Sequence, residues 1–389
     1  MQQILFERQH ENLTTDEERI KLFSNFPYKE VPYSRRNWGH PWHSFCSYQS
    51  KLKPAIAYFL IKIFTRVGDR ILDPLAGVGT IPFEACLQNR IGIGVDINPV
   101  AFNCMVNKVN PPEPKDVHKV VDELADFLTE YEITDIDYSY ILLKNINGKL
   151  EDYFDPKTFT EILIARSFFL SKYDLTIAES FVLASLLHIL HGNRPYALSR
   201  RSHGLTPFSP SGEFVYKPLL KHLQTKVNRM LATIPSTLIK KGEAYLTSVF
   251  NYQPNDQVDV IITSPPFFKS TRFYLNNWIR LWFCGWQDED FSSSKRNDFV
   301  EELQATDISI YEDIFKKFHQ FLKPGGLCIL HLGAGARHDM GVEIAPFAFK
   351  ADFDKLALIY EDVSRQESHG ITDKGRTIQH QFLFLRKRS

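Results

Sequence analysis

The chain has 389 residues, which is enough for one large domain or two ordinary ones with a substantial core. Hydrophobic residues make up 43% and charged residues 24%, as in soluble globular proteins, and no apolar run reaches the roughly 18 residues of a membrane span. The charged N-terminus is unlike a secretory signal, so we expect a cytoplasmic protein. Five cysteines without CxxC spacing argue against a disulfide framework or a zinc cluster, and we predict no metal site.

The first part of the chain has the pattern of a βαβ unit preceded by an arm. Residues 1–44 are polar and aromatic, and the segment PYSRRNWGHPWHSF at 32–45 predicts an irregular arm. Apolar residues at helical spacing predict a helix over 54–64, which begins at a proline. The next expected elements are a strand that starts at Arg70, a glycine turn at 77–79, a helix over 80–90 and a second strand over 91–96. This order is typical of a parallel sheet.

The stretch from about 111 to 243 departs from this alternation. It opens on the prolines of the segment PPEP, which is typical of a linker, and continues with mainly helical patterns. Residues 178–190 are apolar on most sides and predict a buried helix, whereas 216–234 predict a basic helix. We interpret the stretch as an insertion in the sheet domain or a separate helical lobe. The chain then has three parts, 1–110, 111–243 and 244–389.

The α/β pattern resumes at a continuous apolar strand over 258–263. The elements expected after it are a helix (310–322), a turn at Lys323-Pro324-Gly325-Gly326, a strand (327–333) and two last strands (356–364 and 379–387). We expect the last two to form an antiparallel hairpin at the edge of the sheet. The fold class is therefore α/β, a Rossmann-like and mostly parallel sheet with a C-terminal antiparallel hairpin and a mainly helical insertion.

The turn after the first expected strand has the composition of a ligand-binding loop. Asp73 ends that strand, and Gly77 and Gly79 let the backbone approach a ligand closely. Asp96 ends the second strand about 20 residues later, which suits hydrogen bonds to ribose hydroxyls. The alternatives are a plain turn and a dinucleotide-binding loop. Against the latter, Pro82 breaks the GxGxxG pattern, and the Asp73 carboxylate would repel a pyrophosphate but could bind the amino group of a methionine moiety.

A second turn, the segment SPPF at 264–267, follows the strand over 258–263. Its prolines fix φ and lack N–H groups, which leaves a rigid turn with carbonyl acceptors. Acceptors beside an aromatic face suit the exocyclic amine of a base that has left its helical stack. Methylation at a ring carbon would need a nucleophile such as cysteine, and the nearest in sequence is Cys284. The alternative for this turn is a strand exit without function. Aromatic residues that follow it, such as Phe273 and Trp278, either line the pocket or pack in the core.

The segments DPLAGVGTIPFEA, GVDINP and TSPPF, preceded by SYQSKLKP, resemble the amino-methyltransferases that form N4-methylcytosine or N6-methyladenine in DNA. The likeness covers about 45–110 and 255–335. A long insertion between the motifs is the α-type arrangement of that family, in which the insertion carries target recognition. The resemblance implies a class I methyltransferase fold with S-adenosyl-L-methionine as cofactor. It also implies double-stranded DNA as substrate and, in a restriction-modification setting, a cognate restriction endonuclease as partner.

The resemblance assigns roles to individual residues. The cofactor-binding residues that it implies are Tyr48, Lys51, Pro54, Asp73, Pro74, Ala76, Gly77, Gly79, Thr80, Asp96, Ile97 and Asn98. The catalytic residues that it implies are Ser264 and Pro265, which accept from the target amine, Pro266, and Phe267, which stacks on the base. Serine at the first motif position is typical of cytosine-N4 members, whereas Asp or Asn is commoner in adenine-N6 members, so we favour cytosine. Phe267 stands where Tyr is usual, which preserves stacking but loses any hydroxyl contact.

Two further hypotheses remain open. The segment DPLAGVGTIPFEA also resembles RNA guanine-N2 methyltransferases. Those generally have Asp or Asn before the prolines and an RNA-binding domain ahead of the cofactor motif, for which the roughly 45 residues before Tyr48 leave little room. The other hypothesis is a cofactor-dependent regulator without activity, against which the intact Asp73, Asp96 and Ser264 argue.

The formal net charge of zero would argue against a polyanion partner, but the charges are segregated. Residues 190–241 hold nine Lys or Arg and one acidic residue, whereas 111–161 hold thirteen acidic residues and five Lys. Lys and Arg that neutralise phosphates supply most nonspecific DNA affinity, so we expect the basic segment to face DNA. The alternative is a solvated helix face. The residues expected to contact nucleic acid are Arg194, Arg200, Arg201, Lys217, Lys221 and Lys226.

Overall fold

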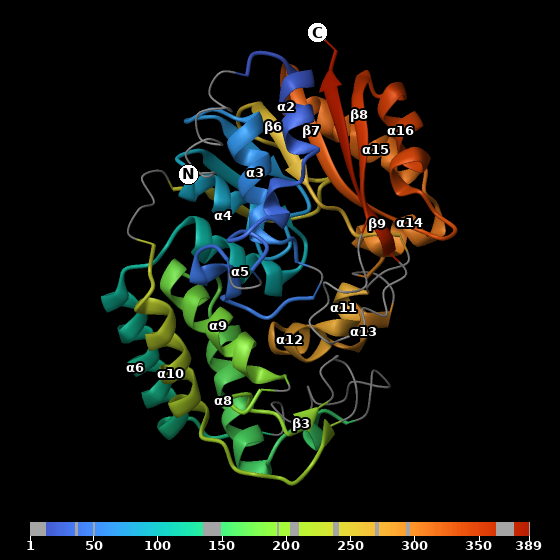
Figure 1. The fold of residues 1–389 in the computed structure, drawn as a ribbon. Helices are drawn as coiled ribbons and strands as arrows, with labels where there is room; N and C mark the ends of the chain where they lie inside the picture. The colour runs from blue at the N-terminus through green and yellow to red at the C-terminus, as the bar shows by residue number, and fades with distance from the viewer. Residues whose placement is uncertain are drawn as a thin grey trace.

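A seven-stranded sheet in the order β5-β2-β1-β6-β7-β9-β8 forms the centre of the fold (Figure 1). The computed structural model describes residues 13–35, 38–49, 51–134, 149–192, 194–202, 210–235, 241–268, 272–292, 296–362 and 377–388. The strands are β1 (Arg70–Asp73), β2 (Ile91–Asp96), β5 (Glu243–Leu246), β6 (Val258–Thr263), β7 (Leu322–Gly335), β8 (Phe353–Asp362) and β9 (Thr377–Lys387). The first four strands of the order pair in parallel, as do β6 and β7, while β9 is antiparallel to β7 and β8. The expected Rossmann-like sheet with a C-terminal antiparallel hairpin is confirmed.

Helices cover both faces of the sheet because its central strands are apolar on both sides. Alternate side chains of a strand point to opposite faces, so Ile71 and Leu72 of β1 enter different cores. The helices in the core of Ile71 are α2 (Asp16–Phe23), α3 (Pro54–Phe64) and α4 (Thr80–Leu87), and those in the core of Leu72 are α15 (Ile310–Phe321) and α16 (Met340–Lys350). The helices predicted over 54–64, 80–90 and 310–322 correspond to α3, α4 and α15.

The N-terminal arm is more regular than its composition predicts. It contains α2, whose first turn is closed by a capping box. The Thr15 hydroxyl accepts from the Glu18 N–H at 3.2 Å, and the Glu18 carboxylate accepts from the Thr15 N–H at 3.1 Å. Phe23 at the end of α2 is fully buried against the sheet. This helix was not predicted, and it lies ahead of the segment at 32–45 that was expected to be irregular.

Two features of the sheet differ from the sequence predictions. Strand β5, at the edge beside β2, was not predicted because the segment EAYL is short and half polar. The turn expected at 323–326 lies inside β7 instead. Val258 of β6 pairs with Leu322 and Val260 pairs with Leu327, so the residues between these partners form a bulge in one long strand.

The described part of the chain between β2 and β5 is mainly helical. Its elements are α5 (Pro99–Val109), α6 (Pro114–Glu130), η3 (Leu150–Tyr153), α8 (Pro156–Leu170), α9 (Ile177–Leu190), β3 (Arg201–Ser202), β4 (Pro210–Ser211) and α10 (Leu219–Leu231). Helix α9 is buried from Ala178 to Leu190, as predicted. It docks on α5, where the Ser180 hydroxyl donates to Asn103 Oδ1 at 2.8 Å and accepts from Asn107 Nδ2 at 3.1 Å. Because α5 directly follows β2, the helices beyond α5, from α6 to α10, are anchored beside the loops at that end of the sheet (Figure 1).

Short elements lie around the sheet and these helices. They are η1 (Pro27–Lys29), η2 (Pro41–Ser44), α11 (Phe273–Asn276), α12 (Trp278–Phe283), α13 (Asp288–Ser292), η4 (Arg296–Asp298) and α14 (Val300–Thr306). The α12 side chains share the apolar core of α8, α9 and α10. From η2, the Trp42 indole N–H donates to the Met230 carbonyl of α10 at 3.0 Å. No helix among the described residues is long and apolar enough to cross a membrane.

Candidate active site

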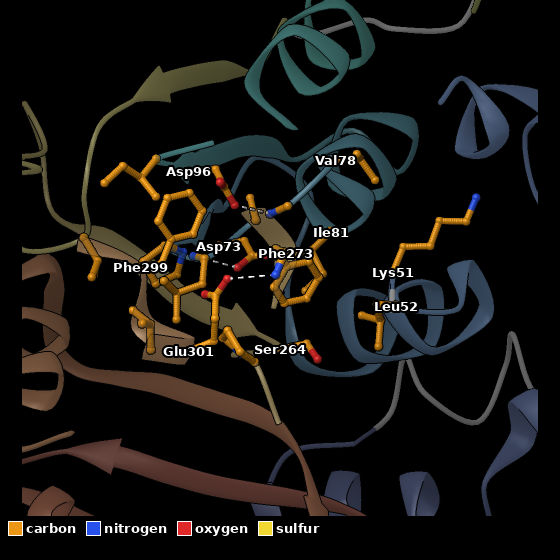
Figure 2. A pocket seen from close by; sticks show the side chains of 18 of the residues that line it. Lys51, Leu52, Asp73, Val78, Ile81, Asp96, Ser264, Phe273, Phe299 and Glu301 are labelled. Atoms are coloured by element: carbon orange, nitrogen blue, oxygen red, sulfur yellow. Dashed lines mark hydrogen bonds between the residues drawn. The ribbon is translucent and has the colours of Figure 1, made fainter. Parts of the chain in front are cut away.

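The carboxyl ends of the parallel strands open into one pocket with about 860 Å³ of empty space, part of which is open to solvent. Asp73 at the end of β1, Asp96 at the end of β2 and Ser264 after β6 all line it (Figure 2). The Thr263 hydroxyl donates to Asp73 Oδ1 at 2.7 Å and ties β6 to β1 at this edge. The glycine turn and the SPPF turn therefore meet at one pocket, which is where open parallel sheets bind ligands.

The glycine turn from β1 to α4 takes a shape that side chains would not allow. Gly77 and Gly79 have positive φ angles of 51° and 74°, in the left-handed region that favours glycine. A Cβ at Gly79 would also lie 2.6 Å from the Met105 side chain of α5. The Gly77 N–H donates to Asp96 Oδ2 at 2.7 Å, so the acid that ends β2 also holds the turn that follows β1. The turn is thus fixed against the pocket.

The two strand-end carboxylates fit a cationic ligand. Desolvation raises the pKa of Asp73 to about 7 and that of Asp96 to about 6. Among the described residues, hydroxyl and N–H groups contact these carboxylates, but no Lys or Arg pairs with them. A bound cation would compensate them, and S-adenosylmethionine carries both an ammonium and a sulfonium group. These residues therefore fit the cofactor that the sequence implies.

The structure divides the other predicted cofactor residues into those that line the pocket and those that support its wall. The lining includes Tyr48, Lys51, Pro74, Ala76, Gly77, Thr80 and Ile97. Asn98 lies behind them, where it donates to the Tyr48 hydroxyl at 3.1 Å and caps α5 through the Val100 N–H at 2.9 Å. Pro54 is the first residue of α3, and it and Gly79 are not part of the lining. The Lys51 ammonium donates to the His43 carbonyl at 2.8 Å, which directs its charge away from Asp73.

Protein contacts hold the SPPF turn in place, and its first residue, Ser264, lines the pocket. Ser264 and Pro266 are among the lining residues, whereas Pro265 is buried behind them. The Pro266 carbonyl accepts from Gln304 Nε2 at 2.9 Å. The Phe267 ring packs against His331, with ring centroids 5.3 Å apart, and a Cβ on Gly333 would lie 2.6 Å from it. The stacking of Phe267 on a base stays a prediction, since its ring packs on protein side chains in this structure.

Several pocket residues were missed by sequence reasoning. They are Thr247, Ser248 and Val249 after β5, and Asp298, Phe299, Val300 and Glu301 at the start of α14, while Phe273, left open between pocket and core, lines the pocket. Glu301 accepts from the Phe273 N–H at 3.1 Å, and desolvation raises the pKa of its carboxyl to about 8 (Figure 2). A prediction of β5 as a further parallel strand would have placed Thr247, Ser248 and Val249 at the pocket, because they directly follow that strand. No motif marked Glu301. Within the described ranges, no group of three His, Cys, Asp or Glu could hold a metal ion.

The basic residues expected to face DNA fall into two groups. Arg194 and Arg201 are exposed between α9 and α10, and Lys221 is exposed in the first turn of α10. Arg200 is only partly exposed: its guanidinium donates to the Gly212 carbonyl and, at 3.0 Å, to the Asp152 carbonyl. The Lys217 ammonium is likewise occupied by two carbonyls, those of Ala197 at 2.5 Å and Ser199 at 2.6 Å. These two side chains brace the loop around them.

Lys226 does not have the position expected of a phosphate contact. Its side chain is 3% exposed, and its ammonium donates to the Phe45 carbonyl at 2.6 Å. Burial lowers its pKa to about 7, with the charge of Arg229 acting in the same direction. The expectation that Lys226 binds nucleic acid was wrong, because the side chain lies on the face of α10 that packs into the molecule.

Comparisons with known proteins match the part of the chain that holds the glycine turn. Residues 41–120 match the family model described as RMKL-like, methyltransferase domain. The type II methyltransferase M.MjaII of Methanocaldococcus jannaschii is 32% identical over 88 residues, which is 23% of this chain and 16% of that relative. The match thus spans a small part of the relative's length.

Three solved structures are similar to this chain in part. A TehB-like S-adenosylmethionine-dependent methyltransferase from Corynebacterium glutamicum has 8% identity and a TM-score of 0.33, covering 86% of this chain and 87% of that one. TrmN from Thermus thermophilus has 14% identity and a TM-score of 0.28, covering 87% of this chain and 50% of that one. A DNA modification methylase described as tentative, also from Thermus thermophilus, has 21% identity and a TM-score of 0.21, covering 36% of this chain and 49% of that one.

The sheet order with its antiparallel β9, the glycine turn that leads into α4 and the family match over 41–120 define the class. The chain carries an S-adenosylmethionine-dependent methyltransferase domain with the class I fold. Its cofactor is S-adenosylmethionine, and the pocket lined by Asp73, Gly77 and Asp96 is where we expect it to bind.

Proposed function

We propose that the protein methylates an exocyclic amino group of a base in double-stranded DNA, with cytosine N4 as the favoured acceptor. The observation that carries the proposal is the position of Ser264, whose side chain lines the same pocket as the Asp73 carboxylate. The Ser264 hydroxyl oxygen can accept hydrogen bonds, and an exocyclic amine donates two. An amine that enters beside the cofactor would therefore meet an acceptor at the SPPF turn.

The chain's own residues would position the reacting groups. Bound S-adenosylmethionine would supply a methyl group on a sulfonium, which a nitrogen lone pair can accept directly. Asp73 would bind the ammonium group of the cofactor and Asp96 its ribose. Ser264 would accept one N–H of the amine and so orient the nitrogen, and the methylated amine would release its extra proton to water. Gln304 holds the Pro266 carbonyl and keeps this turn in place.

Nitrogen is a better acceptor than carbon in this pocket. Methyl transfer to a ring carbon requires a covalent nucleophile, in practice a cysteine thiolate. No cysteine is among the pocket-lining residues within the described ranges. Burial raises the pKa of the Cys284 thiol to about 12, which makes it a poor nucleophile in any case.

Three observations favour DNA and cytosine. The relative that matches over 88 residues is named a type II methyltransferase. Exposed Arg194 and Arg201, between α9 and α10, and Lys221, in α10, lie in the segment where the α-type arrangement carries target recognition. Serine as the first residue of the SPPF turn is typical of cytosine-N4 enzymes, and adenine N6 is the alternative target. A restriction-modification system with a cognate endonuclease is the setting that this proposal implies.

RNA is the second candidate substrate. The segment DPLAGVGTIPFEA resembles RNA guanine-N2 methyltransferases, and the family model matches the residues that contain it. The base would enter the same pocket, and the same turn would accept from the guanine amine. The two substrates are distinguished by experiment.

The full chain should transfer label from methyl-tritiated S-adenosylmethionine to unmethylated genomic DNA and not to total RNA. After hydrolysis, we expect the label in N4-methyldeoxycytidine. DNA from a host that expresses the protein is the matched control, because its sites are already methylated and it should take up no further label. Label in N6-methyldeoxyadenosine would move the target to adenine. Label in RNA alone would overturn the DNA proposal.

A further inference from the structure

We propose that His331 is a positioning residue, which turns the Ser264 hydroxyl so that its oxygen faces the methyl-accepting amine. The inference rests on the proposed function and extends it to a residue of β7, outside the two motif turns. His331 would act through Ser264 alone and would contact neither the cofactor nor the base.

The contact between the two side chains follows from the register of the sheet. Strands β6 and β7 are parallel neighbours, and Thr263 pairs with Leu330. The next residue on each strand therefore lies alongside the other, and Ser264 Oγ is 3.0 Å from His331 Nδ1. Ser264 lines the pocket, whereas the His331 side chain is 5% exposed. In this hydrogen bond, Ser264 faces the substrate space and His331 is enclosed by protein.

The surroundings of the imidazole select its tautomer. His331 Nε2 has no hydrogen-bond partner among the described residues. The rings of Phe267, His380 and Phe382 surround it, with centroids at 5.3, 4.8 and 5.0 Å. The faces of aromatic rings carry partial negative charge, so they attract an N–H and repel a lone pair. The proposal accordingly places the hydrogen on Nε2, so that Nδ1 accepts from the Ser264 hydroxyl.

The charges around His331 keep the ring neutral. Burial lowers the pKa of its imidazole well below the usual value, and the charge of His380 on β9 acts in the same direction. Glu361 on β8 opposes this shift, and Lys53 ahead of α3 reinforces it. Glu361 is itself engaged by the Tyr28 hydroxyl at 2.6 Å and the Lys29 ammonium at 3.0 Å. A neutral His331 retains a lone pair on Nδ1 that can accept from the Ser264 hydroxyl, and the lowered pKa makes the ring a weak base, so it orients Ser264 rather than removing a proton.

This orientation determines what Ser264 can offer to a substrate. A hydroxyl that donates its only hydrogen to His331 presents lone pairs to the pocket and acts as an acceptor there. It then favours a base group that donates hydrogens, such as an exocyclic amine, over a base carbonyl. Without His331, the Ser264 hydroxyl can rotate so that its hydrogen points into the pocket. Two hydrogen-bond donors, this O–H and the N–H of the amine, would then face each other.

Replacement of His331 by leucine should lower kcat for methyl transfer about tenfold, since one neutral hydrogen bond is lost, while the Kd for S-adenosylmethionine stays within about twofold. His331→Asn should recover most of the rate, because Asn Oδ1 can occupy the position of Nδ1 as an acceptor. Phe384→Leu is the matched packing control, since Phe384 is fully buried on β9 and packs on Phe23 and Phe64. It should lower the melting temperature without lowering kcat.

A double-mutant cycle separates positioning from packing. Adding His331→Leu to Ser264→Ala should cost less than about a further twofold, because the hydroxyl that His331 orients is already gone. If the decrease in kcat of the double variant equals the product of the decreases of the two single variants, the inference is wrong. Wild-type activity on DNA reports on the proposed function, and the ratio between variants reports on His331, so the two can fail separately.

The tautomer provides a test that needs no substrate. In the wild-type protein with ¹⁵N-labelled histidine, the His331 ring nitrogens should show Nε2–H and an unprotonated Nδ1 at pH 7, with the signals assigned by their loss in His331→Asn. A ring protonated on Nδ1 would contradict the proposal, whether or not a methyl acceptor has been found.

Discussion

Replacing Ser264 by alanine should lower kcat for methyl transfer about a hundredfold or more, because it removes a positioned acceptor at the reacting amine. The Kd for S-adenosylmethionine should stay within about twofold, since the groups that fit the cofactor, Asp73 and Asp96, are untouched. Equilibrium binding and single-turnover methylation of DNA by the same preparation measure both quantities.

The matched control for this variant is Ser185→Ala. Ser185 is fully buried in α9, and its hydroxyl has no hydrogen-bond partner among the described residues. The exchange removes the same oxygen at a site away from the pocket and should leave the rate unchanged. A Ser264→Ala enzyme as fast as Ser185→Ala would show that the SPPF turn does not take part in the reaction.

Asp73→Asn should weaken S-adenosylmethionine binding about tenfold to a hundredfold, which is the cost of a lost hydrogen bond to a charged group. The ligand-free variant should be at least as stable as the wild type at pH 8. An amide oxygen can still accept from the Leu75 N–H and the Thr263 hydroxyl, while the buried charge is gone. Titration calorimetry and thermal melting give the two values. The exposed Asp313 of α15, exchanged for Asn, is the control and should change neither.

The pH dependence of both quantities follows from the raised pKa of Asp73, about 7 in the folded protein, against about 3.9 in an unfolded chain. Between these values the folded state binds more protons than the unfolded state, so this group's contribution to stability is lost as pH rises through 7. Cofactor binding has the opposite trend, because the ligand selects the carboxylate. The wild-type affinity should therefore rise from pH 6 to pH 8, and Asp73→Asn should flatten that rise. If the affinity rises equally with pH in the wild type and in Asp73→Asn, then Asp73 does not bind the ammonium group.

The parts of the site that could be predicted are those determined by local pattern. The sequence has an apolar strand that ends in an acid, followed by a glycine turn and a helix. This pattern predicted the positions of Asp73 and Gly77, because parallel strands end at one edge of a sheet. The same holds for the SPPF turn after β6. Two strand ends that neighbour each other in the sheet converge whatever lies between them in sequence.

Lys226 shows an error that helical spacing could have prevented. Leu219, Leu223, Val227 and Met230 are buried on one face of α10, and Lys226 lies on the same face. Charge composition alone placed it with the exposed basic residues. The length of a lysine side chain lets its ammonium reach the Phe45 carbonyl from that face.

Glu301 and His331 could not be assigned from the sequence for a different reason. Glu301 reaches the pocket because the start of α14 lies at the carboxyl ends of the strands, and no local pattern records that position. His331 contacts Ser264 through the register of β6 and β7, which the bulge at 323–326 shifts. Both depend on tertiary geometry rather than on a motif.

The central claim is that the turn after β1 and the turn after β6 form one reaction pocket. A crystal structure of the protein with S-adenosylhomocysteine tests it most directly. We expect the amino group of the ligand at Asp73, its ribose at Asp96 and its sulfur facing Ser264. A ligand bound elsewhere, or held at the glycine turn with its sulfur directed away from Ser264, would contradict the account.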